Sequence, residues 1–323
     1  MRAAVYDRYG GVDRLRLIEV ATPVPGPGQV LVEVVATSLN LSDWEVLHGS
    51  PAYARIGGLF RPARRILGSD IAGIVAAVGP GVTRWRVGDE VYGDNLDLKG
   101  GFAEFAVAPE RALARKPAEL TFEQASTIPQ SGAIAAQAVA RARPGERMLL
   151  NGAGGGVGVF AIPLAVAAGI HVTAVDNAGK LDFLRELGAA EVIDYRAADF
   201  TRAGPFDLIV DLVARRSVFA YRRALSPGGR AVVVGGTMRV LLRMLTLGTL
   251  VGRLSGTRLG VMAVREGPEH FAPVADAVAS GAVTVVIDRV FPLEQVAEAL
   301  TFHGEGRALG KVVVRVRAGA ERL

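Results

Sequence analysis

The stretch LLNGAGGGVGVF, residues 149–160, constrains the fold more than any other part of the chain. Five of the seven residues from Gly152 to Gly158 are glycine, and they directly follow an apolar run. Because glycine has no β-carbon, such a stretch lets another group approach the backbone closely. The same loop between a strand and a helix would direct backbone N–H groups at a phosphate. The stretch predicts a dinucleotide-binding turn, and a tight turn without any ligand is the alternative.

The surroundings of the glycine stretch favour the dinucleotide site. A predicted strand ends at Asn151, and a predicted helix begins near Val157. The next predicted strand ends in Asp176, 18 residues after Gly158. In dinucleotide-binding folds an acidic residue at this place accepts hydrogen bonds from the adenosine ribose.

The rhythm of strands and helices changes along the chain, which at 323 residues exceeds a typical single domain. The first third alternates β-rich runs with glycine and proline turns, which is typical of a largely antiparallel β domain. From about residue 119, strands and helices alternate as in βαβ units with a parallel sheet. The last 35 residues return to strand, helix and strand. We therefore expect an α/β protein of two domains.

Composition excludes several classes of function. The chain has no cysteine, which excludes disulfides, thiolate zinc sites and a cysteine nucleophile. Its net charge of +5 comes from scattered arginines, so we expect no nucleic-acid partner. The apolar stretch 231–252 is interrupted by Arg239 and Arg243, so we expect no membrane partner. The first residues do not look like a signal peptide, so we expect a cytoplasmic protein.

Several motifs occur in the order found in one family. They are SLNLSDWEVLHG, GSDIAGIVAAVGPGVTRWRVGDEVYG, GGFAEFAV, NGAGGGVG, KLDFLRELGAAEVIDY and FPLEQVAEALTFHGEGRALGKVVV. With these motifs the chain resembles the medium-chain dehydrogenase/reductases, in particular their zinc-independent quinone oxidoreductase branch. The resemblance implies a GroES-like β domain over 1–118, a Rossmann domain over 119–262, and a segment over 263–323 that completes the first domain. It also implies a homodimer.

The resemblance also implies chemistry without a metal. Zinc-dependent relatives have a cysteine where this chain has Asn40, and a His-Glu pair where it has Ser69 and Asp70. The four histidines are scattered, so no zinc-binding set is expected, and Asp70 is interpreted as a structural hydrogen-bonding group. Without a Lewis acid, the accessible reaction is hydride transfer from a reduced nicotinamide to a quinone or to the conjugated C=C of an apolar enone.

Three residues are catalytic candidates through the resemblance. Asn40 matches the asparagine near the nicotinamide, and Asp43 is its N-x-x-D partner, with a loop cap as the alternative role. Tyr53 is a candidate donor of a proton or hydrogen bond, with the anchoring of a loop as its alternative role. Many relatives have a threonine where this chain has Ile134, which removes one contact to the cofactor.

The expected cofactor is NADPH, with NADH also possible. Asp176 would repel a 2′-phosphate and so favours NADH. Lys180 and Tyr195 match positions that hold the 2′-phosphate in this branch, and so favour NADPH. The complete set of expected cofactor-binding residues is Gly152, Ala153, Gly154, Gly155, Gly156, Val157, Gly158, Asp176, Lys180, Tyr195, Val213 and Gly235.

Two other functions stay open from the sequence. The first is an enoyl reductase that acts on a polyketide-like or acyl thioester intermediate, for which Arg61, Arg64 and Arg65 are candidate phosphate contacts. The second is a non-catalytic NADPH-binding protein. The segment MRVLLRMLTLG, from residue 238, would border an apolar substrate. A buried interface helix explains it equally well, and a membrane-surface helix less well.

Overall fold

The computed structural model describes residues 1–56 and 58–317, and the chain forms two compact units. Unit 1 comprises Met1–Ala133 and Glu266–Leu323, and unit 2 comprises Ile134–Arg265. The expected boundaries at 118/119 and 262/263 differ from these. Helix α2 (Phe122–Ser126) packs on the sheet of unit 1, while Arg265 exchanges two hydrogen bonds with Gln137 of unit 2. Residues 318–323 of the expected segment 263–323 lie outside the described residues.

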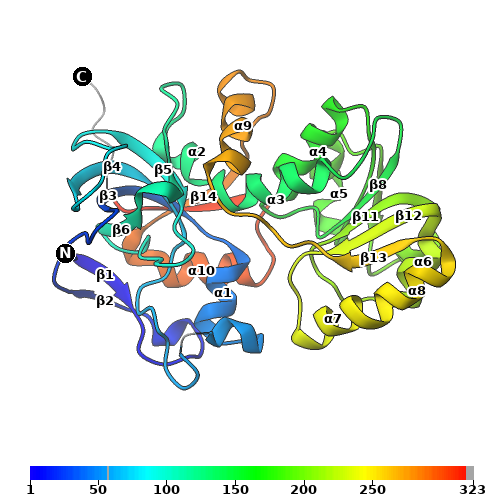
Figure 1. Ribbon diagram of the computed structural model, residues 1–323, viewed down its shortest axis with the longest axis horizontal. Coiled ribbons are helices and arrows are strands. Elements are labelled where there is room, and N and C mark those ends of the chain that lie inside the picture. The colour runs from blue at the N-terminus through cyan, green and yellow to red at the C-terminus, as the bar shows by residue number, and fades with distance from the viewer. Residues whose placement is uncertain (57, 318–323) are drawn as a thin grey trace. The chain divides into compact units, whose positions relative to one another are not determined.

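Unit 1 is built on one seven-stranded sheet (Figure 1). Its path runs β14-β15-β3-β4-β5-β7, and β6 also pairs with β3. The strands are β3 (Gln29–Ser38), β4 (Asp70–Val78), β5 (Glu90–Asp94), β6 (Phe105–Pro109), β7 (Leu113–Arg115), β14 (Ile287–Pro292) and β15 (Lys311–Arg315). All pairs are antiparallel except β14 with β15. The C-terminal strand β15 is thus an interior strand of the sheet.

The remaining elements of unit 1 surround this sheet. They are the antiparallel pair β1 (Arg2–Val5) and β2 (Arg16–Glu19), and the helices α1 (Leu41–His48), α9 (Pro268–Ala279) and α10 (Val296–Gly304). Helix α3 (Pro129–Val139) begins in unit 1, and the boundary between the units falls within it.

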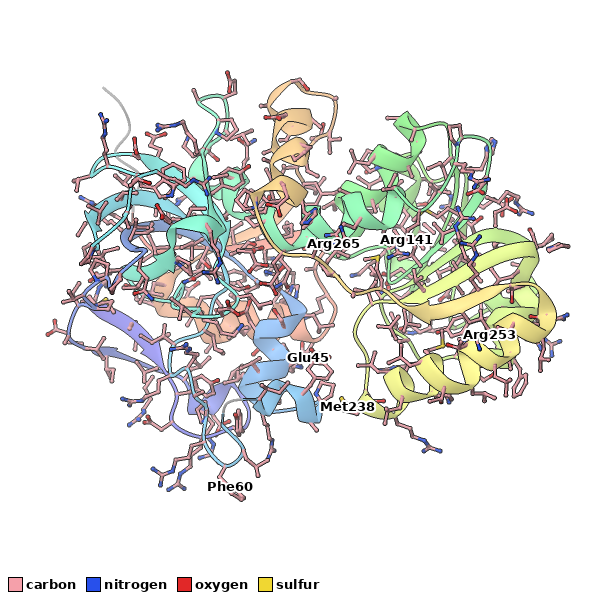
Figure 2. The ribbon with its side chains drawn as sticks, in the orientation of Figure 1. Glu45, Phe60, Arg141, Met238, Arg253 and Arg265 are labelled. Carbon is pink, nitrogen blue, oxygen red and sulfur yellow. The ribbon has the colours of Figure 1, made fainter. Side chains whose placement is uncertain are left out.

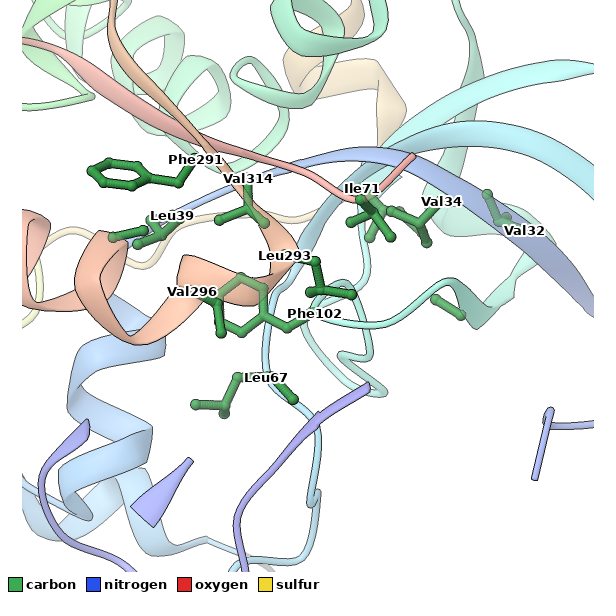
Figure 3. Close-up of a cluster of buried hydrophobic side chains, with 14 of the residues drawn as sticks. Val32, Val34, Leu39, Leu67, Ile71, Phe102, Phe291, Leu293, Val296 and Val314 are labelled. Atoms are coloured by element: carbon green, nitrogen blue, oxygen red, sulfur yellow. The ribbon is translucent and has the colours of Figure 1, made fainter. Parts of the chain in front are cut away.

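The core of unit 1 joins residues far apart in the sequence. Figure 3 shows Val32, Ile71 and Phe102 from the first part of the chain clustered with Leu293 and Val314 from the last part. All five side chains are buried. Burial of such side chains stabilises the fold by about 1.5–3 kcal/mol each, so both parts of the chain are needed for this core.

Unit 2 is a parallel, doubly wound sheet. The strand order is β10-β9-β8-β11-β12-β13, and every neighbouring pair is parallel. The strands are β8 (Arg147–Asn151), β9 (His171–Asp176), β10 (Glu191–Asp194), β11 (Phe206–Asp211), β12 (Leu225–Val233) and β13 (Arg258–Val261). The expected α/β class is confirmed: unit 1 has a largely antiparallel sheet, and unit 2 has the parallel, doubly wound sheet of a Rossmann domain.

Helices cover both faces of the unit 2 sheet. Helices α4 (Gly158–Ala167) and α5 (Leu181–Glu186) lie on one face, and α6 (Val218–Ala224), α7 (Met238–Arg243) and α8 (Thr249–Ser255) on the other (Figure 1). A π-helical turn, Met244–Gly248, joins α7 to α8. No helix within the described ranges is both long enough and apolar enough to cross a bilayer.

Candidate functional site

The glycine loop joins β8 to α4 in unit 2, at the carboxyl edge of the parallel sheet. A β-carbon on Gly158 would lie 1.7 Å from the backbone oxygen of Ala153, so packing of the loop itself requires glycine there. A β-carbon on Gly155 would have only the oxygen of Gly152, 3.8 Å away, within 4 Å. The protein's own packing does not require glycine at 155. The free space and the adjacent start of α4 fit a bound pyrophosphate.

The other members of the loop divide by exposure. Ala153, Gly154 and Gly158 are buried and hold the loop against the sheet, whereas Gly155, Gly156 and Val157 are partly exposed. Gly152 has φ of +82°, a conformation that favours glycine. The expected nucleotide loop therefore has a buried base and a partly exposed rim.

Asp176 ends β9 and turns back to the glycine loop. Its Oδ2 accepts a hydrogen bond from Gly154 N at 2.8 Å, and its Oδ1 accepts from Asn177 N at 2.8 Å. Lys180 is buried, and its Nζ donates to Gly154 O at 3.3 Å. A β-carbon on Gly154 would lie 2.4 Å from Lys180 Cδ and 2.9 Å from Asp176 Oδ2. Glycine at 154 therefore allows both charged side chains to reach the loop.

Tyr195 follows β10 and is 43% exposed. Its backbone N–H donates to Asp176 O at 3.1 Å, which fixes it beside the end of β9. The guanidinium of Arg196 lies 5.6 Å from the centroid of its ring. Two cations, Lys180 and Arg196, therefore follow Asp176 in the sequence, and the sequence analysis missed Arg196.

Asp211 holds the next loop of the same edge. Its Oδ1 accepts hydrogen bonds from Asn151 Nδ2 at 2.8 Å, Val213 N at 2.8 Å and Ala214 N at 2.7 Å. Its Oδ2 accepts from Tyr221 Oη at 2.7 Å. This buried carboxylate fixes the backbone of Val213 next to the end of β8. Gly235, the last expected cofactor residue, follows β12 with φ of +72°.

In unit 1, Asn40 lies at the centre of a buried polar network. Its Oδ1 accepts from Lys311 Nζ at 2.9 Å, and its Nδ2 donates to Asp70 Oδ2 at 2.8 Å. Lys311 Nζ also donates to Ser131 Oγ at 3.1 Å, and it lies 3.8 Å from Asp70 Oδ2. Lys311 and Asp70 are fully buried, so the orientation of the Asn40 amide is fixed by an ion pair closed to solvent.

The buried environment changes the pKa values of this pair. Burial raises the pKa of Asp70 to about 6, and the Lys311 ammonium opposes that rise. Burial also lowers the pKa of Lys311, which the nearby carboxylates oppose. The interpretation of Asp70 as a structural hydrogen-bonding group agrees with these contacts, because its Oδ1 also accepts from Gln130 N at 3.1 Å.

Asp43 has a positioning role. Its Oδ2 accepts from Asn40 N at 3.0 Å, and its Oδ1 accepts from Gly68 N at 3.1 Å. The side chain is fully buried, and burial raises its pKa. Both oxygens are thus used to cap α1 and to hold the loop before β4. These contacts are those of the alternative role given to Asp43, a cap that positions Asn40.

Asp94 and Lys99 extend the charged cluster. Asp94 pairs in register with Asp70 across β5 and β4, and burial together with the Asp70 charge raises the pKa of Asp94 well above its usual value. Within the described residues, Asp94 Oδ1 and the buried Lys99 Nζ have no hydrogen-bond partner. The cluster thus contains three carboxyl groups and two lysines.

Tyr53 anchors a loop. It lies in the short helix Ala52–Arg55, and its Oη donates to Glu45 Oε2 of α1 at 3.0 Å. Burial raises the pKa of Glu45, while the hydrogen bond from Tyr53 opposes that rise. This contact matches the alternative role given to Tyr53.

The residues at the zinc position do not fit a zinc ion. Asn40, Ser69 and Asp70 supply one carboxylate, whose oxygens already accept hydrogen bonds from Asn40 and Gln130. The Lys311 ammonium beside that carboxylate would repel a cation. In the part of the chain that the structure describes, no three His, Cys, Asp or Glu side chains are grouped to hold a metal.

The arginines considered for a phosphate of an acyl carrier make other contacts. Arg65 pairs with Asp7 at 2.5 Å, and Arg64 Nε donates to Asp97 O at 3.1 Å. Arg61 is exposed. The structure therefore does not gather the three into one anion site.

Lys311, Ser131 and Asp211 were missed by the sequence analysis. Lys311 follows a glycine at the start of a strongly apolar strand. Because a buried charge needs a partner, a lysine at that place was a signal that a paired, buried group lies there. Asp211 ends a strand at the carboxyl edge of the sheet, as Asp176 does. This shared position could have identified Asp211 as a candidate site residue.

Comparison with known proteins identifies the family. Residues 26–118 match the alcohol dehydrogenase GroES-like domain, and residues 187–314 match the zinc-binding dehydrogenase family. A chloroplastic quinone oxidoreductase of Triphysaria versicolor is 32% identical, over 97% of this chain and 98% of its own length. The 2-methylene-furan-3-one reductase of Solanum lycopersicum is 32% identical, over 97% of this chain and 79% of its own.

A solved structure agrees with this assignment. The quinone oxidoreductase from Coxiella burnetii has a TM-score of 0.88 at 28% identity, over 98% of this chain and 99% of its own. Together with the nucleotide loop, these matches show that the chain belongs to the quinone oxidoreductase branch of the medium-chain dehydrogenase/reductase family and is an NAD(P)H-dependent oxidoreductase.

Proposed function

We propose that the chain uses NADPH, with NADH as a second donor, to reduce a quinone or the conjugated C=C of an apolar enone. The observation that carries this proposal is the cradle at Gly155, where the missing β-carbon leaves space at the start of α4. The relatives named for quinone and furanone reduction support the acceptor class. The bound nicotinamide supplies the hydride.

The cations beside the nucleotide loop support NADPH. Lys180 contacts the loop from within, and Arg196 stands over the ring of Tyr195. Both oxygens of Asp176 already accept N–H groups of the protein, so its charge is partly satisfied before a nucleotide binds. A bound 2′-phosphate would therefore be repelled less by the Asp176 carboxylate, and it could pair with the cations of Lys180 and Arg196.

Asn40 is the group proposed to stabilise the reduced acceptor. The Lys311 ammonium withdraws electron density through Oδ1, which strengthens Nδ2–H as a donor. One hydrogen of Asn40 Nδ2 is donated to Asp70 Oδ2. The other makes only a long contact, 3.5 Å, to Ser69 Oγ. That hydrogen is available to an acceptor carbonyl oxygen as it gains negative charge.

Oxidation of NADPH and of NADH by EDTA-treated protein tests the proposal. The acceptors are apolar enones, an ortho-quinone and an enoyl thioester. Turnover of an enone or the quinone that survives chelation, with NADPH preferred, is the expected result. Turnover of the thioester alone would favour the enoyl reductase, and NADPH binding without turnover of any acceptor would favour the non-catalytic alternative.

A further inference from the structure

The charged cluster of unit 1 does not balance. Its three carboxyl groups, those of Asp43, Asp70 and Asp94, act on the same surroundings as two ammonium groups, those of Lys99 and Lys311. Asp43, Asp70 and Lys311 are fully buried and Lys99 is 6% exposed, so water screens these charges little. With all five groups ionised, the cluster would carry one negative charge in excess. Buried groups avoid such a charge by taking up a proton.

Two of the three carboxyl groups have partners that stabilise their ionised forms. Asp43 accepts hydrogen bonds from two backbone N–H groups. Asp70 lies 3.8 Å from Lys311 Nζ and accepts a hydrogen bond from Asn40 Nδ2. Asp94 Oδ1, by contrast, is buried, and among the described residues nothing donates to it and no cation pairs with its carboxyl group. Asp94 is therefore the place for the balancing proton.

The neighbours of Asp94 also favour its protonated form. The charged groups that face it from the surrounding elements are Asp70 of β4, Asp43 of α1, Lys311 of β15, Lys99 of the following loop and Glu266 before α9. Burial and the like charges of Asp70 and Glu266 raise the pKa of Asp94 well above its usual value. The Lys99 ammonium opposes that rise.

A cavity connects Asp94 with solvent. Its volume is about 200 Å³, and its lining includes Asp94, Asp97, Arg111 and Glu266, all of unit 1. Glu266 follows Arg265 on the segment that leads to α9 (Figure 2). The side chains of Asp97 and Arg111 are 67% and 79% exposed, so the cavity opens to the surface. Several water molecules fit in it, because each takes about 30 Å³.

Lys99 is held beside this acid in an unfavourable backbone conformation. Its φ of +56° lies in the left-handed region, which residues with a side chain rarely adopt. Lys99 N donates to Asn95 O at 2.6 Å, and Asn95 Nδ2 donates to Lys99 O at 2.5 Å. Lys99 Nζ is buried and has no hydrogen-bond partner in the part of the chain that the structure describes. Such strain is typical of functional sites, and here it keeps an uncommitted ammonium near Asp94.

We propose that the cluster stores one proton on Asp94 and delivers it to the acceptor, an inference that rests on the proposed function. Hydride addition to a conjugated C=C leaves an enolate, which must take up one proton. The O–H bond of Asp94 breaks, Asp70 on the paired strand relays the proton, and a new O–H bond forms on the enolate oxygen beside Asn40. Asp94 is left as a carboxylate that Lys99 compensates. A solvent proton from the cavity then restores its acid form.

Infrared spectroscopy of the full chain, before nucleotide is added, tests the stored proton. Protonated carboxyl groups absorb apart from ionised carboxylates, and we expect this band in the wild type at pH 7. Asp94→Asn should lose it. The matched control is Asp97→Asn, which should keep it, because Asp97 lines the same cavity but is largely exposed. Lys99→Met should enlarge the band by about twofold, since a second carboxyl group must then take up a proton.

Steady-state turnover of an enone tests the delivery. In Asp94→Asn, kcat should fall by at least about tenfold, because a positioned proton donor contributes a factor of about 10²–10⁴ and water replaces it only in part. The KM for NADPH should stay the same, because the nucleotide loop belongs to unit 2. The wild-type kcat should fall as pH rises through the pKa of Asp94, and Asp94→Asn should lack this fall. Asp94→Glu should restore part of the activity.

The outcomes separate this inference from the proposed function. The same carboxyl band in Asp94→Asn and the wild type would overturn the stored proton. An unchanged kcat in Asp94→Asn would overturn the delivery, whatever the spectrum shows. A wild type that turns over no acceptor would overturn the proposed function and the delivery with it, while the infrared comparison would still decide whether Asp94 holds the proton. Circular dichroism should show every variant folded.

Discussion

Lys311 and Asp70 are both closed to solvent, and their charges compensate each other. Replacing Lys311 with Met would leave the Asp70 carboxylate buried without a cation, which costs about 3–5 kcal/mol in comparable pairs. We expect Lys311→Met to lower the free energy of unfolding by about that amount in urea titrations at pH 7. The double variant Asp70→Asn/Lys311→Met should recover part of the loss. Single losses that simply add in the double variant would mean that the two residues are not coupled.

Asp70 also predicts an unusual dependence of stability on pH. Its pKa is about 6 in the folded protein and 3.8 for the unperturbed group, because burial disfavours the carboxylate. The folded state therefore holds this proton more tightly than the unfolded chain does, and its contribution to stability is lost as pH rises from about 4 to about 6. We expect the wild type to lose stability relative to Asp70→Asn over this range, on the order of 3 kcal/mol. Parallel pH profiles of the two proteins would contradict the assignment.

Arg196 is the residue at which the choice between NADPH and NADH is best tested. It is exposed and lies over the ring of Tyr195, so its removal should leave the fold intact. We expect Arg196→Gln to raise the KM for NADPH by about tenfold, since a charge-assisted hydrogen bond contributes about 1.5–3 kcal/mol. The KM for NADH should stay the same. Equal changes for both nucleotides would show that Arg196 does not contact the 2′-phosphate.

At the scale of one element, the loop between β8 and α4 offers two glycines with opposite expectations. In Gly158→Ala the new β-carbon would lie 1.7 Å from Ala153 O, so the melting temperature should fall strongly. In Gly155→Ala it would have one protein atom within 4 Å, at 3.8 Å, so the melting temperature should stay near that of the wild type. Calorimetric titration of Gly155→Ala should nevertheless show NADPH binding weakened by about tenfold or more, because the methyl group occupies space kept for the phosphates. Unchanged affinity would place the phosphates elsewhere.

The elements were largely predictable from the sequence, whereas the contacts between distant elements were not. Alternation of strands and helices after residue 119 predicted the parallel sheet, and the glycine stretch lies where that prediction put it, after Asn151. Lys311 and Asp70 are far apart in the chain, and no local periodicity links them. The N-x-x-D spacing of Asp43 suits both a helix cap and a catalytic acid. Only the structure shows that its two carboxylate oxygens accept hydrogen bonds from backbone N–H groups, as a cap does.

At the scale of the whole molecule, unit 1 depends on the last part of the chain. Strand β15 lies between β14 and β3, so a chain that ends at Arg265 would lack two strands and expose the edge of β3. We expect this truncated chain to lose the folded structure of unit 1. Both tryptophans, Trp44 and Trp85, belong to unit 1, so their fluorescence reports on it specifically. A red-shifted emission spectrum relative to the full chain is expected, and an unchanged spectrum would contradict the dependence.

The order of the segments also has a consequence for synthesis on the ribosome. Unit 2 is one continuous stretch, so it can fold as soon as Arg265 has emerged, while the first part of unit 1 still waits for its partner strands. At roughly 5–20 residues per second, about ten to forty seconds separate the translation of Ala133 from that of Lys311. During that time Asp70 has no lysine to neutralise it, and the edge of β3 has no β15 to cover it. The nascent chain therefore completes its nucleotide-binding half first, and Asn40 acquires its fixed orientation only after Lys311 has been translated.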